Sequence, residues 1–391
     1  MPSLDSPIVI VSATRTPMGG FQGALSSQSA TDLGAIAIKE AMVRAGLSVN
    51  YIDEVLMGCV LPAGLGQAPA RQAARQAGVP DGVPCTTLNK VCGSGMKAVM
   101  LGAAQLQTGE ASLVVAGGME SMSNAPYLLD KARSGFRIGH GQVLDHMFTD
   151  GLEDAYEGKA MGVFAQQTAD RFGVSREAMD DYAFQSLNRA TRAIASGAMT
   201  EEIVPVSTAK GDVTEDEQPG KARPDKIRTL RPAFSKTGTV TAANSSSISD
   251  GAAALVLMRE ADALAQGVQP LARIKGYVSH AQKPEEFTLA PIEGIRKLMK
   301  KLGWQKSDVD LFEINEAFAV VTMLAIRKLG LDEDQVNIHG GACALGHPLG
   351  ASGARILVTL LHALKRTGGH KGIASLCIGG GEATAIAIEI L

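Results

Sequence analysis

Two thiols, one imidazole and one side-chain amide stand beside glycines or at strand ends in this sequence. Cys92 lies in NKVCGSGMK, and Cys377 lies in SLCIGGG, one residue before three glycines. His347 lies in ALGHPLGASG, and Asn315 interrupts the apolar segment FEINEAFA. Thiols and an imidazole are suited to nucleophilic and acid–base catalysis. The set predicts acyl transfer followed by carbon–carbon bond formation, with one thiol holding the acyl group and the other moving a proton.

Cys92 is placed where a strand turns into a helix that we expect to begin near Ser94. The positive end of a helix dipole and the free backbone N–H groups there favour a thiolate. The same N–H groups can hold an oxyanion formed by attack of the sulfur. A small buried hydrophobic residue is the alternative for a lone cysteine, and the position alone does not decide between the two.

The other three residues also have structural alternatives. His347 has the right pKa range to take a proton from a thiol, but it can equally be a turn residue with a satisfied ring. Cys377 is presented at a turn with bare backbone amides around it, that of Gly379 included, or it is simply buried. The Asn315 amide can position a water or a substrate oxygen, or it can cap a helix.

The composition limits the possible partners. Lys and Arg number 37 against 40 Asp and Glu, a formal charge of −3, so no general attraction to nucleic acid or to an anionic membrane is expected. Five widely spaced cysteines without a CxxC argue against a disulfide framework and a zinc site. The N-terminus does not resemble a signal peptide, and no apolar run approaches about 18 residues. We therefore expect a cytoplasmic protein without a metal.

Buried strands alternating with amphipathic helices indicate an α/β protein. The strand-like runs are short and apolar, at residues 8–11, 112–118, 254–258 and 374–380. A helical stripe at residues 31–46 follows the first of them. From 123 to 244 strand-like runs become sparse, and 207–232 is charged and loop-like. A disordered linker is one explanation, but a helical stripe at 177–197 favours a folded insertion.

Two segments share one pattern. Residues 91–121 and 349–383 both read as a Gly-Ser or Ala-Ser-Gly turn, an apolar helix, Thr-Gly, a buried strand and a Gly-rich turn ending in Glu. Two similar halves meeting at a pseudo-twofold axis would bring both glycine-rich turns together. Unrelated strand–turn–helix units can show the same pattern, so the internal repeat is a hypothesis.

Three motifs closely resemble those of the thiolases, in the family's order: NKVCGSGMKA, NIHGGACALGHPLGASG and GIASLCIGGGEATA. The similarity extends over essentially the whole chain and is greatest to the bacterial acetyl-CoA C-acetyltransferase branch. It implies duplicated α/β halves in five layers, with mixed sheets and helices between and outside them, plus an inserted loop domain. The implied divisions are 1–122 with 245–271, the loop domain 123–244, and 272–391.

The resemblance also implies roles for single residues. Cys92 corresponds to the nucleophile, His347 to its base and Cys377 to the acid and base at the substrate's α carbon. Asn315, through a water, and His347 would bind the thioester oxygen as it becomes an enolate. The backbone N–H groups of Cys92 and Gly379 would hold the tetrahedral oxyanion.

Coenzyme A would be gripped by the loop domain. Residues that match the pantetheine channel are Leu152, Met161, Ala233, Phe234 and Ser246. Near the 3'-phosphate, Pro219 replaces an expected arginine, so Lys221 or Arg223 is the candidate partner. Ala160 stands where short-chain members often have histidine, which leaves room for a longer or branched acyl chain.

The implied activity is reversible Claisen condensation of two acetyl-CoA to acetoacetyl-CoA and coenzyme A through acetyl-Cys92, with no metal or redox cofactor. A degradative 3-ketoacyl-CoA thiolase of broader chain length would use the same residues. A ketoacyl synthase is disfavoured because Cys377 stands where histidine or asparagine is needed. A non-catalytic acyl-CoA or lipid-binding protein would require loss of a catalytic position. The resemblance implies a homotetramer built from dimers.

Overall fold

A single mixed sheet runs through the protein, whose computed structural model describes residues 6–391. Nine strands follow one another in the order β12-β13-β14-β11-β1-β10-β5-β3-β4, and the short β2 pairs antiparallel with the start of β10. Their bounds are β1 Ile8–Arg15, β2 Gly19–Gly20, β3 Glu54–Gly58, β4 Cys85–Leu88, β5 Leu113–Ser121, β10 Ser249–Arg259, β11 Ala272–Ala281, β12 Leu311–Ile314, β13 Lys371–Ile378 and β14 Glu382–Ile390. The four apolar runs expected to form strands all lie in this sheet.

The sheet contains two halves of similar design. In the first half, β5 is parallel to β3 and antiparallel to β10. In the second, β13 is parallel to β12 and antiparallel to β14. Strands β1 and β11 join the halves through a short antiparallel contact, Val9 with Arg273 and Ile10 with Ala272. The expected internal repeat and the α/β fold class are therefore confirmed.

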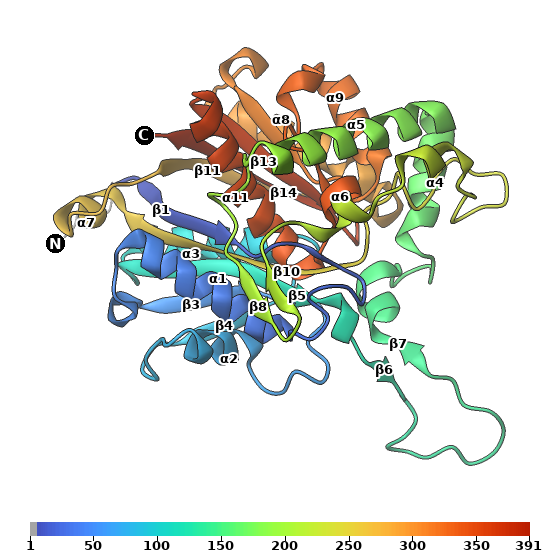
Figure 1. Ribbon diagram of the computed structural model, residues 1–391, viewed down its shortest axis with the longest axis horizontal. Coiled ribbons are helices and arrows are strands. Elements are labelled where there is room, and N and C mark those ends of the chain that lie inside the picture. Colours follow the sequence, from blue (N-terminus) through green and yellow to red (C-terminus); the bar gives the residue numbers. More distant parts are fainter. Residues whose placement is uncertain (1–5) are drawn as a thin grey trace.

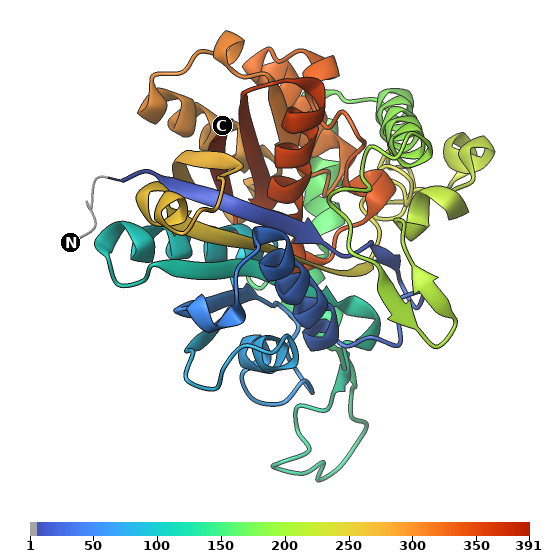
Figure 2. The ribbon, with the colours of Figure 1, turned by 60° about the vertical axis from the view of Figure 1, so that its left-hand side comes forward.

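Helices lie between and outside the halves. The main ones are α1 Ala30–Ala45, α2 Pro69–Gln76, α3 Ser94–Thr108, α7 Glu260–Ala265, α8 Ala290–Leu302, α9 Ala319–Leu329, α10 Ala342–Leu345 and α11 Leu349–Thr367. The corresponding helices α3 and α11 pack on each other and contact strands of both halves. Helix α1 covers β10, β5 and β1, whereas α8 covers β11, β13 and β14. Helix α11, red in Figure 2, is buried along almost its whole length, whereas α3 keeps exposed residues such as Leu101.

Local sequence fixes where these helices begin and end. In α1, the Ser29 hydroxyl accepts from the Asp32 amide while the Asp32 carboxylate accepts from the Ser29 amide, a capping box. The helix ends at Gly46, whose φ of 67° is left-handed. Helix α3 begins at Ser94, where the sequence predicted it.

Residues 123–244 add no strand to the main sheet. Their strands form two separate two-stranded ladders, and their elements are β6 Tyr127–Leu128, β7 Leu144–Asp145, α4 Met161–Phe172, α5 Arg176–Ala195, β8 Val206–Thr208, β9 Gly211–Val213 and α6 Glu217–Lys221. Segment 207–232, expected to be loop-like, thus contains most of a hairpin and the short helix α6. The segment between β6 and β7 projects from the body (Figure 1). Within residues 6–391, no helix is long and apolar enough to cross a membrane.

Candidate active site

Most of the residues predicted to take part in chemistry line one cavity of about 380 Å³, whereas Asn315 does not line it. Cys92, His347, Cys377 and Gly379 all line it. Cys92 precedes α3, His347 precedes α11, and Cys377 lies near the end of β13. Because α3 and α11 correspond in the two halves, the duplication places both helix N-termini and the end of a central strand at the same cavity.

A strained turn presents Cys92. Val91 has a φ of 46°, an unfavourable conformation for a β-branched residue. The Ser94 hydroxyl holds this turn, because it donates to the Val91 carbonyl at 2.7 Å and accepts from the Lys90 amide at 2.8 Å. Such strain persists only where the surroundings impose it and is typical of functional sites.

Burial governs the protonation of Cys92. It raises the pKa of the thiol to about 11, although the backbone N–H groups of Gly379 and of Cys92 itself lower it. The thiolate expected at the helix N-terminus is therefore not favoured, since desolvation outweighs the amides. The two N–H groups nevertheless face the sulfur, where they can meet an oxyanion formed by its attack.

His347 is held as a neutral base. The Ser352 hydroxyl donates to the Pro348 carbonyl at 2.8 Å and lies 2.5 Å from the imidazole Nδ1. Since the hydroxyl proton is already used, Nδ1–H is the donor and Nε2 keeps its lone pair. Burial, assisted by the positive charge of Arg355, lowers the pKa of His347 to about 3. The imidazole is therefore free to accept a proton at neutral pH.

Asn315 lies beside this imidazole. It follows β12, and its amide Nδ2 is 3.4 Å from both ring nitrogens of His347. Its backbone N–H donates to the Ser375 carbonyl at 3.0 Å, which continues the pairing of β12 with β13. It does not cap a helix, because the N-cap of α9 is Phe318. Among the described residues, no protein donor reaches its buried Oδ1.

Cys377 is the second thiol of the cavity. Burial raises its pKa well above the usual value, and the nearby Cys92 raises it further. A thiolate formed there would be a strong base, as removal of a proton next to a thioester requires. The arrangement thus joins two thiols, a neutral imidazole and converging N–H donors. In the part of the chain that the structure describes, no cluster of His, Cys, Asp and Glu is suited to a metal ion.

Comparison with known proteins agrees with this geometry. The family descriptions "Thiolase, N-terminal domain" and "Thiolase, C-terminal domain" match residues 8–261 and 268–390. The chain belongs to the thiolase family. This thiolase is 52% identical to acetyl-CoA acetyltransferase 2 of Arabidopsis thaliana, over 98% of this chain and 97% of that one. It is also 52% identical to the acetyl-CoA acetyltransferase of Escherichia coli K12, over 98% of this chain and 99% of that one.

A solved structure resembles this thiolase in three dimensions. The Acat5 thiolase of Ascaris suum, crystallised in complex with coenzyme A, superposes with a TM-score of 0.95. The two chains are 44% identical, and the match covers 98% of this chain and 100% of the other.

The expected coenzyme A residues of this thiolase divide into two groups. The five pantetheine candidates all line the cavity: Leu152, Met161, Ala233, Phe234 and Ser246. Ala160 lines it too. Lys221 and Arg223 are exposed and do not line it, and Lys221 forms an ion pair with Glu217.

Sequence reasoning missed several residues. Phe287 and Phe318 line the cavity and meet edge to face, with ring centroids 6.4 Å apart. Phe287 lies in a short 3-10 turn without a recognisable motif, so nothing in the sequence indicated it. Ser352 was detectable in principle, because it follows His347 by five residues at the start of a helix.

Proposed function

We propose that this thiolase is an acyl-CoA C-acyltransferase that condenses two acetyl-CoA to acetoacetyl-CoA and coenzyme A, and catalyses the reverse thiolysis. The single observation that supports it most is the meeting of Cys92, His347 and Cys377 at one cavity. The two acetyl-CoA acetyltransferases described above support the choice of substrate.

The first half-reaction acetylates Cys92. His347 Nε2 takes the thiol proton as the sulfur attacks the thioester carbonyl of acetyl-CoA. The N–H groups of Cys92 and Gly379 hold the oxyanion. The bond to the coenzyme A sulfur then breaks, and the leaving thiolate takes the proton from His347. Because both Cys92 and His347 start neutral, proton transfer accompanies attack rather than preceding it.

The second half-reaction forms the carbon–carbon bond. The Cys377 thiol proton passes to His347 as the Cys377 sulfur removes an α proton from a second acetyl-CoA. Protonated His347 and a water held by Asn315 stabilise the enolate oxygen. The enolate carbon attacks the acetyl group, and the bond to Cys92 breaks. The Cys92 thiolate recovers its proton from His347, which returns every group to its starting state without a metal or redox cofactor.

A broader degradative thiolase is the second candidate, since Ala160 leaves this part of the cavity wall small. Thiolysis kinetics separate the two functions. We expect kcat/KM to be higher for acetoacetyl-CoA than for a ten-carbon 3-ketoacyl-CoA. The opposite order would replace the short-chain assignment, and no turnover of either thioester would contradict the proposed activity.

Coenzyme A binding at the nucleotide end is also a proposal. The five cavity residues would contact pantetheine. The exposed ammonium group of Lys221 or guanidinium group of Arg223 would bind the 3'-phosphate. Thioesters of 3'-dephospho-coenzyme A test this: in Lys221→Ala with Arg223→Ala, the normal preference for the phosphorylated form should shrink. An unchanged preference would contradict the assignment.

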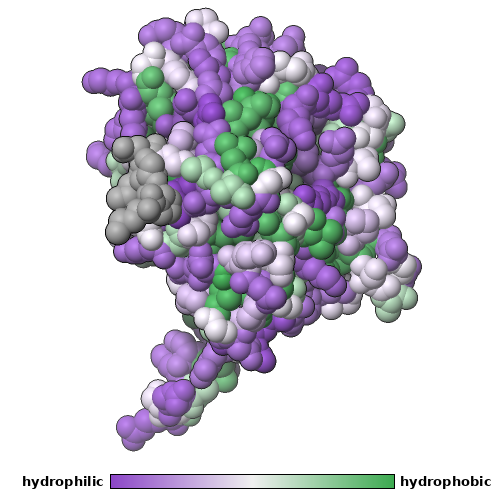
Figure 3. Space-filling view, turned by 90° about the vertical axis from the view of Figure 1, so that its left-hand side faces the viewer, coloured by the Kyte–Doolittle hydropathy of each residue, from purple (hydrophilic) through white to green (hydrophobic). Residues whose placement is uncertain are grey.

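We propose that the protein is a cytoplasmic homotetramer, a dimer of dimers. We also propose three domains: an N-terminal half of residues 1–122 and 245–271, a loop domain of residues 123–244 inserted into it, and a C-terminal half of residues 272–391. The segment between β6 and β7 projects from the body (Figure 3). Among its mostly polar residues, Phe136, Ile138 and Val143 are exposed. Exposed apolar side chains on a projection favour contact with another subunit. Five free thiols favour a reducing compartment.

A further inference from the structure

Glu316, next to Asn315, is a buried carboxylate with an unusual set of partners. Its side chain is fully buried and does not line the cavity. Oε1 accepts from the Tyr182 hydroxyl and from Asn337 Nδ2, both at 2.9 Å. Oε2 accepts from the Ser186 hydroxyl at 2.8 Å and from the Cys343 amide at 3.1 Å.

All four donors are neutral. Within residues 6–391, no ion pair involves Glu316. An isolated buried carboxylate is costly unless hydrogen bonds replace its hydration, and here each oxygen has two. Such fully connected polar groups fix one arrangement of their neighbours. The carboxylate is therefore a junction whose geometry depends on all four donors.

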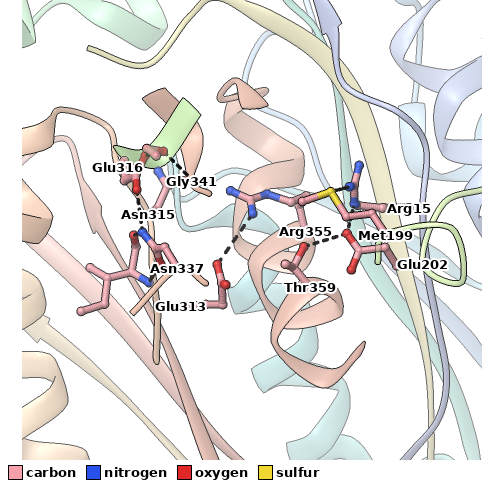
Figure 4. A network of polar contacts seen from close by, with 12 residues as sticks. Arg15, Met199, Glu202, Glu313, Asn315, Glu316, Asn337, Gly341, Arg355 and Thr359 are labelled. Carbon is pink, nitrogen blue, oxygen red and sulfur yellow. Dashed lines mark hydrogen bonds and ion pairs between the residues drawn. The ribbon is translucent and has the colours of Figure 1, made fainter. Parts of the chain in front are cut away.

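The donors connect Asn315 to distant parts of the chain. Tyr182 and Ser186 lie on α5 of the segment 123–244. Asn337, with a left-handed φ of 49°, also accepts from the Ile314 amide and donates to the Ile314 carbonyl, both at 2.8 Å. Its side chain thus pairs with the open edge of β12 as a neighbouring strand would. Figure 4 shows Asn337 beside Glu316, joined to it by a dashed contact.

We propose that Glu316 is a positioning residue that fixes the direction of the Asn315 amide. On one side, the backbone N–H of Asn315 donates to the Ser375 carbonyl of β13. On the other side, the adjacent Glu316 is held in place by hydrogen bonds from Tyr182, Ser186 and Asn337. His347 has two anchors that do not involve Glu316, because its amide donates to the Ser247 carbonyl and its ring to Ser352. The inference rests on the proposed function and assigns Glu316 to the enolate half-reaction alone.

Glu316→Gln is a sharp test of this junction. Each carboxylate oxygen faces one hydroxyl and one N–H group. The hydroxyl can rotate and accept a hydrogen bond from a new amide, whereas the N–H group can only donate. Whichever way the new amide is oriented, its NH2 group therefore opposes the N–H of Asn337 or of Cys343. The strand end must shift, and a displacement on the order of 1 Å at a catalytic group can cost about 10²-fold in rate.

The readout separates the two half-reactions. Acetylation of Cys92 by acetyl-CoA is followed by peptide mass, and enolate formation by deuterium uptake into the acetyl group in D2O. For Glu316→Gln we expect acetylation within about threefold of the wild type and deuterium uptake lowered by about 10 to 10²-fold. Thr168→Val is the matched control: it breaks the buried 2.8 Å contact with Thr288, which includes none of the partners of Glu316, and should leave both rates unchanged.

The outcomes are distinguishable. Equal losses in both rates, or no loss in either, would overturn the positioning role. Absence of acetylation in the wild type would instead refute the proposed function. If Glu316→Gln does not fold, Tyr182→Phe and Ser186→Ala each remove one donor and should lower deuterium uptake about threefold to tenfold while sparing acetylation. Unchanged uptake in both would overturn the inference.

Discussion

Gly95→Ala perturbs the contact that brings the two halves of the site together. Gly95 lies in the first turn of α3, directly after the Cys92 turn. A Cβ there would lie 2.9 Å from the Ala354 amide nitrogen and 2.9 Å from the Gly350 carbonyl oxygen, both backbone atoms of α11. Since backbone cannot rotate away as a side chain does, the two helices must separate.

The size of the effect follows from these distances. Normal contact for a methyl group begins near 3.4 Å and is comfortable toward 4 Å, so the helices must move apart by about 0.5 to 1 Å. Overpacking of this kind costs about 1 to 3 kcal/mol in the free energy of unfolding. Because α3 follows Cys92 and α11 follows His347, the same movement misplaces nucleophile and base, at a cost of about 10 to 10²-fold in the acetylation rate.

Denaturant unfolding and the rate of Cys92 acetylation measure the two effects. Gly102→Ala, on the same helix, is the control: its Cβ would meet only side-chain atoms, Val114 Cγ1 at 3.0 Å and Leu257 Cδ1 at 3.2 Å, which can give way. We expect its acetylation rate to stay within about twofold, because the helix need not move. A Gly95→Ala protein with normal acetylation would refute the link between helix spacing and catalysis, even if it were less stable.

Three further predictions concern the site. Ser352→Ala removes the acceptor of His347 Nδ1–H and should lower the acetylation rate by about tenfold or more, whereas an unchanged rate would show that the ring is held otherwise. With the His347 pKa near 3, the base is neutral down to pH 5, so the acetylation rate should stay constant between pH 8 and 5; an acid limb near 6.5 would contradict this. Ala160→Leu should lower kcat/KM for a ten-carbon 3-ketoacyl-CoA about tenfold relative to acetoacetyl-CoA; a constant ratio would place the acyl chain elsewhere.

Short local patterns were sufficient to predict the main elements around the site. The Gly-Ser-Gly after Cys92 indicated a helix beginning at Ser94, and the glycines after Cys377 indicated the end of a strand. Both predictions hold because such boundaries depend on neighbours in sequence. The repeat predicted that two similar turns would meet, and Cys92 and His347 do line one cavity.

Features that depend on distant contacts were not predictable. The expectation of a Cys92 thiolate rested on the adjacent helix alone. Burial, which the local sequence does not reveal, raises the pKa of the thiol instead of lowering it. Nothing in the neighbouring sequence indicated that Gly95 admits the close approach of α11. Glu316 was visible only as an interruption, since its partners Tyr182 and Asn337 come from far along the chain.

The central claim is that Cys92 carries the acetyl group and Cys377 acts after it. Brief incubation with acetyl-CoA, followed by mass analysis of the peptides, tests this directly. We predict an added acetyl group on the Cys92 peptide of the wild type and of Cys377→Ala, which should acetylate but not condense, and none in Cys92→Ser. An unmodified Cys92 peptide, or acetylation that depends on Cys377 instead, would contradict the account.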